Sequence, residues 1–128
     1  MQIYYNLRSV PVHLYKPDTF VRNETTMLKS HFSAIWESVA DAVPEHIALI
    51  QGERRMTWRD YESRSAKLAQ GLMEAGLGKH AKVGMYLYNS PEYAETNFAA
   101  LKIGGVPINV NYRYLYDELF YLLENADV

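Results

Sequence analysis

The chain has 128 residues, of which 13 are Lys or Arg and 15 are Asp or Glu, so its charges nearly cancel. This length suits a single domain, and the apolar content of 48% is typical of globular proteins. The charge balance argues against a broad nucleic-acid surface, and the lack of cysteine excludes disulfides and thiolate metal sites. Residues 1–17 lack the apolar core of a secretory signal, and no apolar run is long enough to cross a membrane. We therefore expect a soluble, cytoplasmic protein without a transmembrane segment.

The first predicted segment, residues 1–28, differs in character from the rest of the chain. Prolines and scattered aromatic residues occur there without the regular spacing of a strand or a helix. We expect a flexible N-terminal extension over residues 1–28 and a folded domain over residues 29–128. Met27 stands just before the patterned region, and an alternative hypothesis makes it the biological start. The mass of the natively expressed protein distinguishes the two.

A helix and a short β-hairpin are predicted next. Apolar residues recur at helical spacing after residue 31, and Pro44 ends the pattern. The predicted inner face of this helix consists of Phe32, Ile35, Trp36, Val39 and Val43. Residues 47–50 and 55–57 are typical of short strands, and Gly52 lies in the turn between them. These patterns predict a hairpin near the start of the folded domain.

A second helix is predicted from residue 58 to about residue 75. Thr57 is a favourable N-cap, and Asp60 complements the positive end of the helix dipole. The predicted inner face consists of Trp58, Tyr61, Ser65, Leu68 and Leu72. Gly71 costs about 1 kcal/mol relative to Ala inside a helix, so we expect it to pack closely against a neighbour. Gly76 stands where a left-handed C-terminal cap is expected.

The last part of the chain alternates between strands and helices. Residues 82–88 and 106–110 are typical of strands, and Pro107 restricts the second of them to an edge or a strand start. Ser90 and Pro91 open a helix that ends at the Gly104–Gly105 pair. A final helix is predicted over residues 115–125. Its predicted inner residues are Leu119, Leu122 and Leu123. This alternation predicts an α/β fold with a parallel sheet and right-handed crossovers.

A phosphate-binding loop is the first motif to seek in such a fold. Gly76, Gly78 and Lys79 resemble half of one, but Met73 replaces its first glycine and His80 replaces its Ser or Thr. These glycines also precede a strand, whereas the dinucleotide-binding fingerprint follows one. We interpret them as a turn between a helix and a strand.

Other chemistry-bearing residues have structural explanations. None of the four histidines, His13, His31, His46 and His80, has the spacing of a metal ligand. Ser90 is typical of a helix cap, because it lacks the glycines that flank a nucleophilic serine. At the start of the final predicted helix, the positive end of the helix dipole stabilises the negative charges of acidic side chains. The acids around that helix are Asp117, Glu118 and Glu124. We assign no catalytic, cofactor-binding or metal-binding residue.

Two groups of residues leave a ligand-binding interpretation open. Tyr86, Tyr88 and Tyr93 are suited to stack on a planar ligand, although we favour packing within the sheet and its helices as their role. The run from Asn111 through Tyr112 to Arg113 follows the carboxyl end of a predicted strand, where open α/β sheets bind ligands. Its alternative is a loop that caps the following helix, and the residues themselves favour this alternative.

Several segments, taken together and in order, resemble the adenylate-forming ligases. The residues that carry the resemblance are Phe32 to Trp36, Ala48 to Ile50, Met56 to Tyr61, Gly76 to Lys79, Lys82 to Leu87, Asn89 to Glu92, Phe98 to Pro107, Asn109 to Tyr114, and Glu118 with Leu119. Within this superfamily the run around Asn111 is similar to that of bacterial fatty-acyl-CoA synthetases. The resemblance covers roughly residues 30–128 and implies an incomplete parallel-sheet subdomain of the large N-terminal domain, truncated before its catalytic segments.

The resemblance also implies an activity for the full-length enzyme. Such enzymes join a fatty or other carboxylic acid to ATP, with Mg²⁺, and then transfer the acyl group to coenzyme A. The Ser/Thr/Gly-rich phosphate loop and the C-terminal catalytic lysine of the family are absent from this sequence. We therefore expect this chain to hold no cofactor and to be inactive alone, with a homodimer or a downstream polypeptide as its partner.

Two further expectations follow from the resemblance. The full-length enzyme is expected to be cytoplasmic or peripherally membrane-associated. The alternative to an enzyme fragment is a non-catalytic binding or scaffolding module. In either case, we expect unpaired strand edges and uncovered apolar helix faces.

Overall fold

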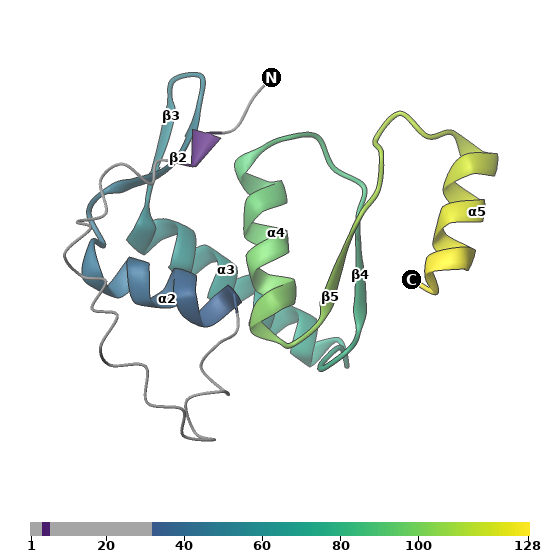
Figure 1. Ribbon diagram of the computed structural model, residues 1–128, viewed down its shortest axis with the longest axis horizontal. Coiled ribbons are helices and arrows are strands. Elements are labelled where there is room, and N and C mark those ends of the chain that lie inside the picture. Colours follow the sequence, from purple (N-terminus) through teal and green to yellow (C-terminus); the bar gives the residue numbers. More distant parts are fainter. Residues whose placement is uncertain (1–3, 6–31) are drawn as a thin grey trace, which may run out of the picture.

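The computed structural model describes residues 4–5 and 32–128. In chain order its elements are β1 (Tyr4–Tyr5), α2 (Phe32–Ala42), β2 (Ile47–Gln51), β3 (Arg54–Thr57), α3 (Trp58–Glu74), β4 (Lys82–Met85), α4 (Pro91–Lys102), β5 (Val106–Asn109) and α5 (Tyr116–Ala126). Figure 1 shows the hairpin and α2 at one end of the molecule, α5 at the other, and α3 running from the hairpin end toward the start of β4. Met27, His13 and His31 lie outside the described residues, and the flexibility of residues 1–28 stays a prediction.

Two small sheets carry the fold. β2 and β3 form the predicted antiparallel hairpin, and β1 pairs with the other edge of β2, so that Tyr4 lies opposite Ile50. The sequence pattern did not predict β1. β4 and β5 pair in parallel, from Lys82 opposite Val106 to Met85 opposite Asn109, with α4 as the connection. The predicted α/β class is therefore confirmed.

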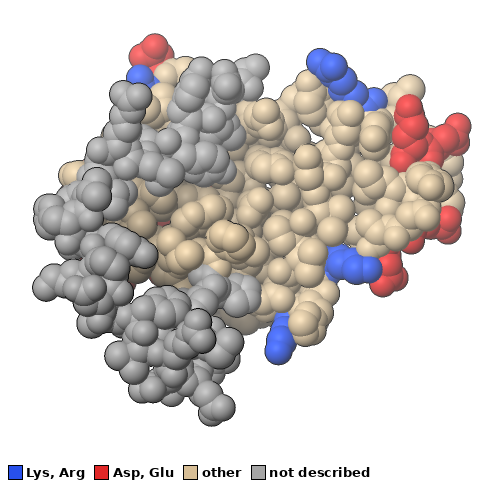
Figure 2. All heavy atoms as spheres, viewed as in Figure 1, with Lys and Arg blue, Asp and Glu red and all other residues tan. Residues whose placement is uncertain are grey.

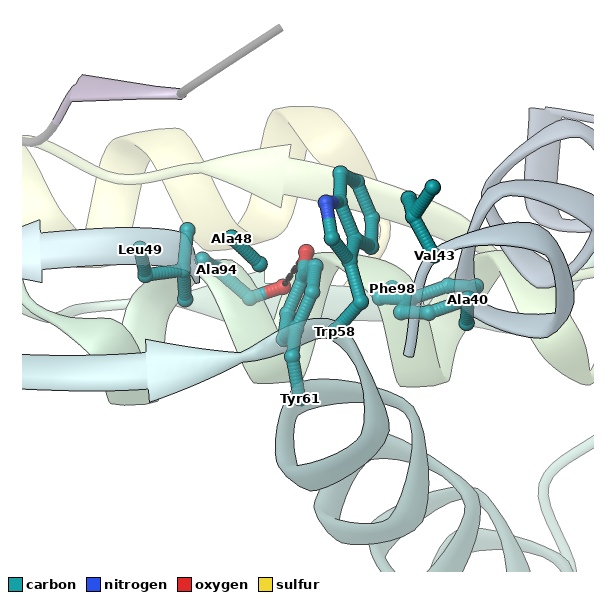
Figure 3. Packing of buried hydrophobic residues seen from close by; sticks show 8 residues of the cluster. All are labelled: Ala40, Val43, Ala48, Leu49, Trp58, Tyr61, Ala94 and Phe98. Carbon is teal, nitrogen blue, oxygen red and sulfur yellow. Dashed lines mark hydrogen bonds between the residues drawn. The ribbon is translucent and has the colours of Figure 1, made fainter. Parts of the chain in front are cut away.

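The main core lies where α2, α3 and α4 meet the hairpin. Figure 3 shows its buried members, which are Ala40, Val43, Ala48, Leu49, Trp58, Tyr61, Ala94 and Phe98. The ring of Trp36 meets Phe98 edge-on, with centroids 5.0 Å apart. The buried Tyr61 hydroxyl donates a hydrogen bond to the Ala94 carbonyl at 3.0 Å. This hydroxyl is thus paired, as burial requires, whereas the buried Trp58 Nε1 of the same cluster has no hydrogen-bond partner among the described residues.

The buried face of α2 differs from the predicted one. Trp36 and Val39 pack against the core, but Phe32 is 68% exposed and Ile35 is 51% exposed. The inner side of α2 instead includes Ser33, which is buried, and Glu37, which pairs with Lys102. The prediction was wrong because it counted apolar residues only, whereas a polar residue and an ion pair take up part of this interface.

Lys102 ties the three helices together. Its ammonium lies 2.6 Å from Glu37 Oε1 on α2 and 2.7 Å from Glu62 Oε1 on α3. The same nitrogen lies 4.5 Å from the centroid of the Phe98 ring. Since the Lys102 side chain is only 11% exposed, these carboxylates and the ring replace the water that its ammonium has lost.

The caps of α3 follow the prediction, but its glycine does not. The Thr57 hydroxyl accepts a hydrogen bond from the Asp60 amide at 3.1 Å, and Gly76 adopts a φ of +87° beyond the end of the helix. Gly71 was expected to pack closely, yet a Cβ atom added there would meet nothing within 4 Å. Leu68, 36% exposed, is replaced on the inner face by buried Ala69. Among the described residues, nothing packs closely against Gly71.

β4 is shorter than the predicted strand over residues 82–88. It ends at Met85, opposite the last residue of β5, and the Val110 amide closes the pairing with a 3.3 Å hydrogen bond to the Met85 carbonyl. Tyr86 and the two residues after it therefore have no neighbouring strand and leave the sheet. An apolar run alone cannot reveal where a partner strand stops.

α5 lies on the side of the β4–β5 pair opposite to α4 (Figure 1). A Cβ atom on Gly84 would lie 2.9 Å from Val128 Cγ1 and 3.6 Å from Leu123 Cδ2, so the end of α5 rests on β4. Leu119, Leu122 and Leu123 point inward only in part, since all three are half-buried and no residue of α5 is buried. Within the described helices, none has both the length and the apolar character needed to cross a membrane.

Candidate functional site

The carboxyl ends of β4 and β5 lie side by side because the two strands are parallel. Tyr86 and Tyr88 follow β4, and the run Asn111–Tyr112–Arg113 follows β5. The structure thus brings together two groups of residues that the sequence presented separately. This edge of an open α/β sheet is where such folds bind ligands, so we treat it as the candidate functional site.

Two tyrosines and an arginine form the exposed part of this site. The rings of Tyr88 and Tyr112 have centroids 4.4 Å apart and are tilted by 39°. The Arg113 guanidinium carbon lies 5.5 Å from the centroid of Tyr112, and no ion pair within the described part of the chain engages Arg113. We call these three residues the edge cluster. It presents two phenol faces and one cation, which suits stacking and charge pairing but contains no nucleophile with an adjacent base.

The loop that carries the edge cluster is shaped by Asn111. Its side-chain oxygen accepts a hydrogen bond from the Arg113 amide at 3.0 Å, and its carbonyl accepts one from the Tyr114 amide at 3.0 Å. The Tyr86 hydroxyl donates to the Tyr114 carbonyl at 2.8 Å, which joins the two loops. Asn111 therefore forms a turn ahead of α5 and does not cap it, since the N-cap of α5 is Leu115.

The start of α4 lies next to this edge and is held by polar contacts. Ser90 caps the helix as predicted, because its hydroxyl accepts a hydrogen bond from the Tyr93 amide at 3.3 Å. Arg54 on the hairpin pairs with Glu92 at 3.0 Å. Hydrogen bonds from its own backbone amide and from Arg54 lower the pKa of Glu92 to about 2. These contacts fix the hairpin against α4 and are structural.

The remaining candidate residues do not join the edge cluster. Gly76, Gly78 and Lys79 lie in the turn between α3 and β4, and the His80 amide donates to the Gly104 carbonyl at 2.8 Å. Glu118 accepts a hydrogen bond from the Leu115 amide at 2.9 Å, which is a local cap of α5. Tyr93 is half-buried in the first turn of α4. Each of these residues has a local structural role.

Three comparisons with known proteins identify the family. The family model for the AMP-binding enzyme matches residues 36–128. The chain belongs to the AMP-binding enzyme family. It is 40% identical over 92 residues to a medium/long-chain-fatty-acid–CoA/3-oxocholest-4-en-26-oate–CoA ligase of Mycobacterium marinum, an alignment that covers 72% of this chain and 17% of the relative. It is 36% identical over 107 residues to the medium-chain acyl-CoA ligase Mig of Mycobacterium avium, with 73% and 20% coverage.

Solved structures of AMP-binding enzymes have the same fold in this region. The N-terminal subdomain of Klebsiella oxytoca NpsA, in complex with anthranilyl-AMSN, superposes with a TM-score of 0.73 at 26% identity. The superposition covers 77% of this chain and 26% of the NpsA chain. The predicted fold, part of the N-terminal domain of an adenylate-forming ligase, is therefore confirmed. The chain spans about a fifth of the length of its ligase relatives.

The AMP-binding family implies ATP, Mg²⁺ and coenzyme A for its full-length enzymes. The residues described here do not fit the ATP–Mg²⁺ group. Among them, no group of three or more His, Asp or Glu side chains is placed to hold a metal ion. The only glycine turn that resembles a phosphate loop, around Gly78, leads into β4 and lacks the Ser or Thr of that motif.

Proposed function

We propose that this chain is the framework segment of an acyl-CoA ligase. In the proposed activity, the whole protein joins a fatty or other carboxylic acid to ATP, releasing pyrophosphate and forming an acyl-adenylate. Coenzyme A then displaces AMP to give the acyl thioester. The observation that carries this proposal is the continuous match of residues 36–128 to the AMP-binding family, together with relatives that are acyl-CoA ligases. ATP and coenzyme A as cosubstrates favour a cytoplasmic location.

The part that we assign to this chain is structural. The aromatic core around Phe98 and the ion pairs of Lys102 hold three helices and the hairpin in a fixed arrangement. The edge cluster then stands at the carboxyl end of the parallel strands, where it faces the remainder of such an enzyme. Because residues 32–128 offer no phosphate cradle and no activated nucleophile, we propose that the chain is inactive alone.

The test is exchange of radiolabelled pyrophosphate into ATP, driven by a panel of fatty acids of different lengths. The isolated chain is expected to give no exchange above a no-protein control. The same chain joined to the part of the M. marinum ligase that follows its 92 matched residues is expected to restore fatty-acid-dependent exchange. Exchange by the isolated chain would contradict the proposed inactivity, and no exchange by a folded joined protein would contradict the ligase assignment.

A second candidate is a non-catalytic scaffolding module derived from such a ligase. The observation that favours it is the closed aromatic core, in which Trp58, Tyr61 and Phe98 are each no more than 1% exposed. A core of this kind can support independent folding. A cooperative thermal transition and a monodisperse species in light scattering would favour the module, whereas poor solubility that the joined ligase segment relieves would favour the framework segment.

A further inference from the structure

Of the strands in the described residues, all but one carry a feature that protects a sheet edge. Natural proteins keep edge strands from pairing with other chains by charged residues, by proline or by shortness. β3 carries Arg54 and Arg55 side by side, β4 begins with Lys82, and the second residue of β5 is Pro107. β1 is only two residues long. Among these strands, β2 alone has none of the protecting features.

β2 has the composition of an inner strand. From Ile47 to Gln51 it contains no charged residue, proline or glycine, and Ala48 and Leu49 are buried in the main core. The irregularity in its pairing with β3 lies between Ile47 and Leu49, so residues 49–51 stay in regular register. Figure 2 shows charged side chains at the tip of the hairpin, and these belong to the turn and to β3. A bare β2 edge would therefore accept another strand readily.

β1 occupies this edge. Tyr4 lies opposite Ile50 and Tyr5 lies opposite Leu49 in antiparallel pairing, so that β2 lies between β1 and β3 (Figure 1). The pairing includes part of the stretch of β2 that is in regular register, where no bulge turns the edge away. β1 therefore covers the edge that the composition of β2 leaves unprotected.

The covering strand comes from outside the region shared with the family. The family model matches residues 36–128, which include β2 and β3 but not β1. Because β1 belongs to the same chain, its local concentration at β2 exceeds that of separate copies at micromolar protein. Pairing within the chain therefore competes well against pairing between chains. A polypeptide that began at Met27 would lack this strand.

We propose that the β2 edge is a docking surface for a second copy of this chain and that β1 blocks it. When β1 is displaced, two β2 strands pair antiparallel about a twofold axis, and the two hairpins form one sheet. Antiparallel pairing is the geometry that β1 itself uses. The β3 edge is less suitable, because Arg54 and Arg55 of two copies would meet there. This inference does not depend on the proposed ligase function.

The test compares proline variants of the full 128-residue chain. Tyr4→Pro/Tyr5→Pro removes both backbone donors of β1, whichever of them points toward β2. Thr25→Pro/Thr26→Pro places two prolines in the same N-terminal segment but outside β1, and is the matched control. The β1 variant is expected to dimerise with a dissociation constant at least about tenfold lower than that of the unmodified chain, whereas the control leaves it unchanged.

Analytical ultracentrifugation over a range of protein concentrations measures these dissociation constants. Three results would each overturn the proposal. The first is a β1 variant that associates no more strongly than the unmodified chain. The second is an equal effect of the two proline pairs, and the third is an assembly larger than a dimer.

Introduced cysteines locate the contact, because the chain contains no cysteine of its own. In the β1 variant, Ile50→Cys is compared with Met73→Cys on α3, where Met73 is 55% exposed. With a short bismaleimide crosslinker, Ile50→Cys is expected to give at least about tenfold more product between chains, because the two β2 strands hold the thiols together. Equal yields would place the contact elsewhere and overturn the proposal.

Hydrogen exchange on the unmodified chain tests the block even if the β1 variant does not fold. Successive residues of a strand alternate in direction, so of the Leu49 and Ile50 amides one points toward β3 and the other toward β1. Both amides are expected to exchange at least about tenfold more slowly than in an unstructured chain. Unprotected exchange of either amide would show that the edge is open and would overturn the proposal.

Discussion

Arg64 on α3 holds the Glu95 carboxylate on α4 through two hydrogen bonds, Nε to Oε1 at 2.6 Å and Nη2 to Oε2 at 3.1 Å. The Glu95 side chain is only 7% exposed, whereas that of Arg64 is 52% exposed. The hydrogen bond and charge of Glu95 raise the pKa of Arg64 above its ordinary value. Because the carboxylate is removed from water, this guanidinium is its main partner among the described residues.

Arg64→Ala is expected to lower the free energy of unfolding by about 1–3 kcal/mol, since it leaves a buried carboxylate without its partner. Arg64→Lys should retain part of the stability, because a single ammonium cannot make the two-point contact. Lys67→Ala, at an exposed position one turn later, is the control and should change stability by less than about 0.5 kcal/mol. Urea denaturation of the three variants measures this, and equal losses for Arg64→Ala and Lys67→Ala would contradict the role of the pair.

Phe98→Ala is expected to destabilise the chain by about 3–5 kcal/mol, because it opens a cavity among Trp36, Tyr61 and Lys102. Phe120→Ala removes the same side chain from α5, where it is 50% exposed, and should cost less than about 1 kcal/mol in the isolated chain. Thermal unfolding followed by circular dichroism compares the two. A larger loss for Phe120→Ala would show that α5 is already packed in the isolated chain.

The Glu92 carboxylate, which is held by its own backbone amide and by Arg54, makes stability depend on pH in the acid range. The folded-state pKa of Glu92 is about 2, below its ordinary value of 4.5. Its contribution to stability is therefore complete above pH 4.5 and is lost as the pH falls toward 2. Glu92→Gln should lower stability at pH 7 by less than about 1 kcal/mol, because the pair is partly exposed.

The difference in the free energy of unfolding between Glu92→Gln and the unmodified chain should shrink as the pH falls from 4.5 toward 2. Urea denaturation at a series of pH values measures the difference. Glu53→Gln, in the turn of the hairpin, is the matched control. A difference that stays constant across this range would contradict the assigned pKa shift.

Two glycine substitutions on and after α3 should have opposite effects. Gly71→Ala is expected to stabilise the chain by about 0.5–1 kcal/mol, because the added methyl group meets no atom within 4 Å and the residue is helical. Gly76→Ala should destabilise it by about 1 kcal/mol or more, because the backbone there has a φ of +87°. The midpoints of urea denaturation compare the two variants. A loss of stability with Gly71→Ala would show that Gly71 does pack closely against a neighbour, contrary to the structure.

Local signals in the sequence were sufficient for most of the helices, for the β2–β3 hairpin and for the β4–β5 pair. Thr57 and Ser90 cap their helices as predicted, because a cap depends only on residues three positions away. The parallel pairing of β4 and β5 followed from the alternation of strands and helices. These features need no knowledge of distant residues.

The features that the sequence did not predict depend on distant partners. The pairing of Tyr4 with Ile50 joins segments that are far apart in the chain, and no local pattern marks it. The orientation of α2 depends on Lys102, and the end of β4 depends on where β5 stops. At the candidate site, the sequence pointed to Tyr88 and to the run around Tyr112 but could not pair them, because their rings meet only after two strands are in register.

The positive φ of Gly104, +70°, has a consequence for how such chains are recognised. Gly104 lies in one of the stretches that carry the likeness to ligases, and Gly76, in another, also has left-handed geometry. A side chain would be strained at either position for reasons of backbone conformation alone. Glycines in these stretches are therefore explained by backbone conformation alone. A non-catalytic scaffold with the same backbone would need the same glycines, so this part of the likeness does not depend on catalytic activity.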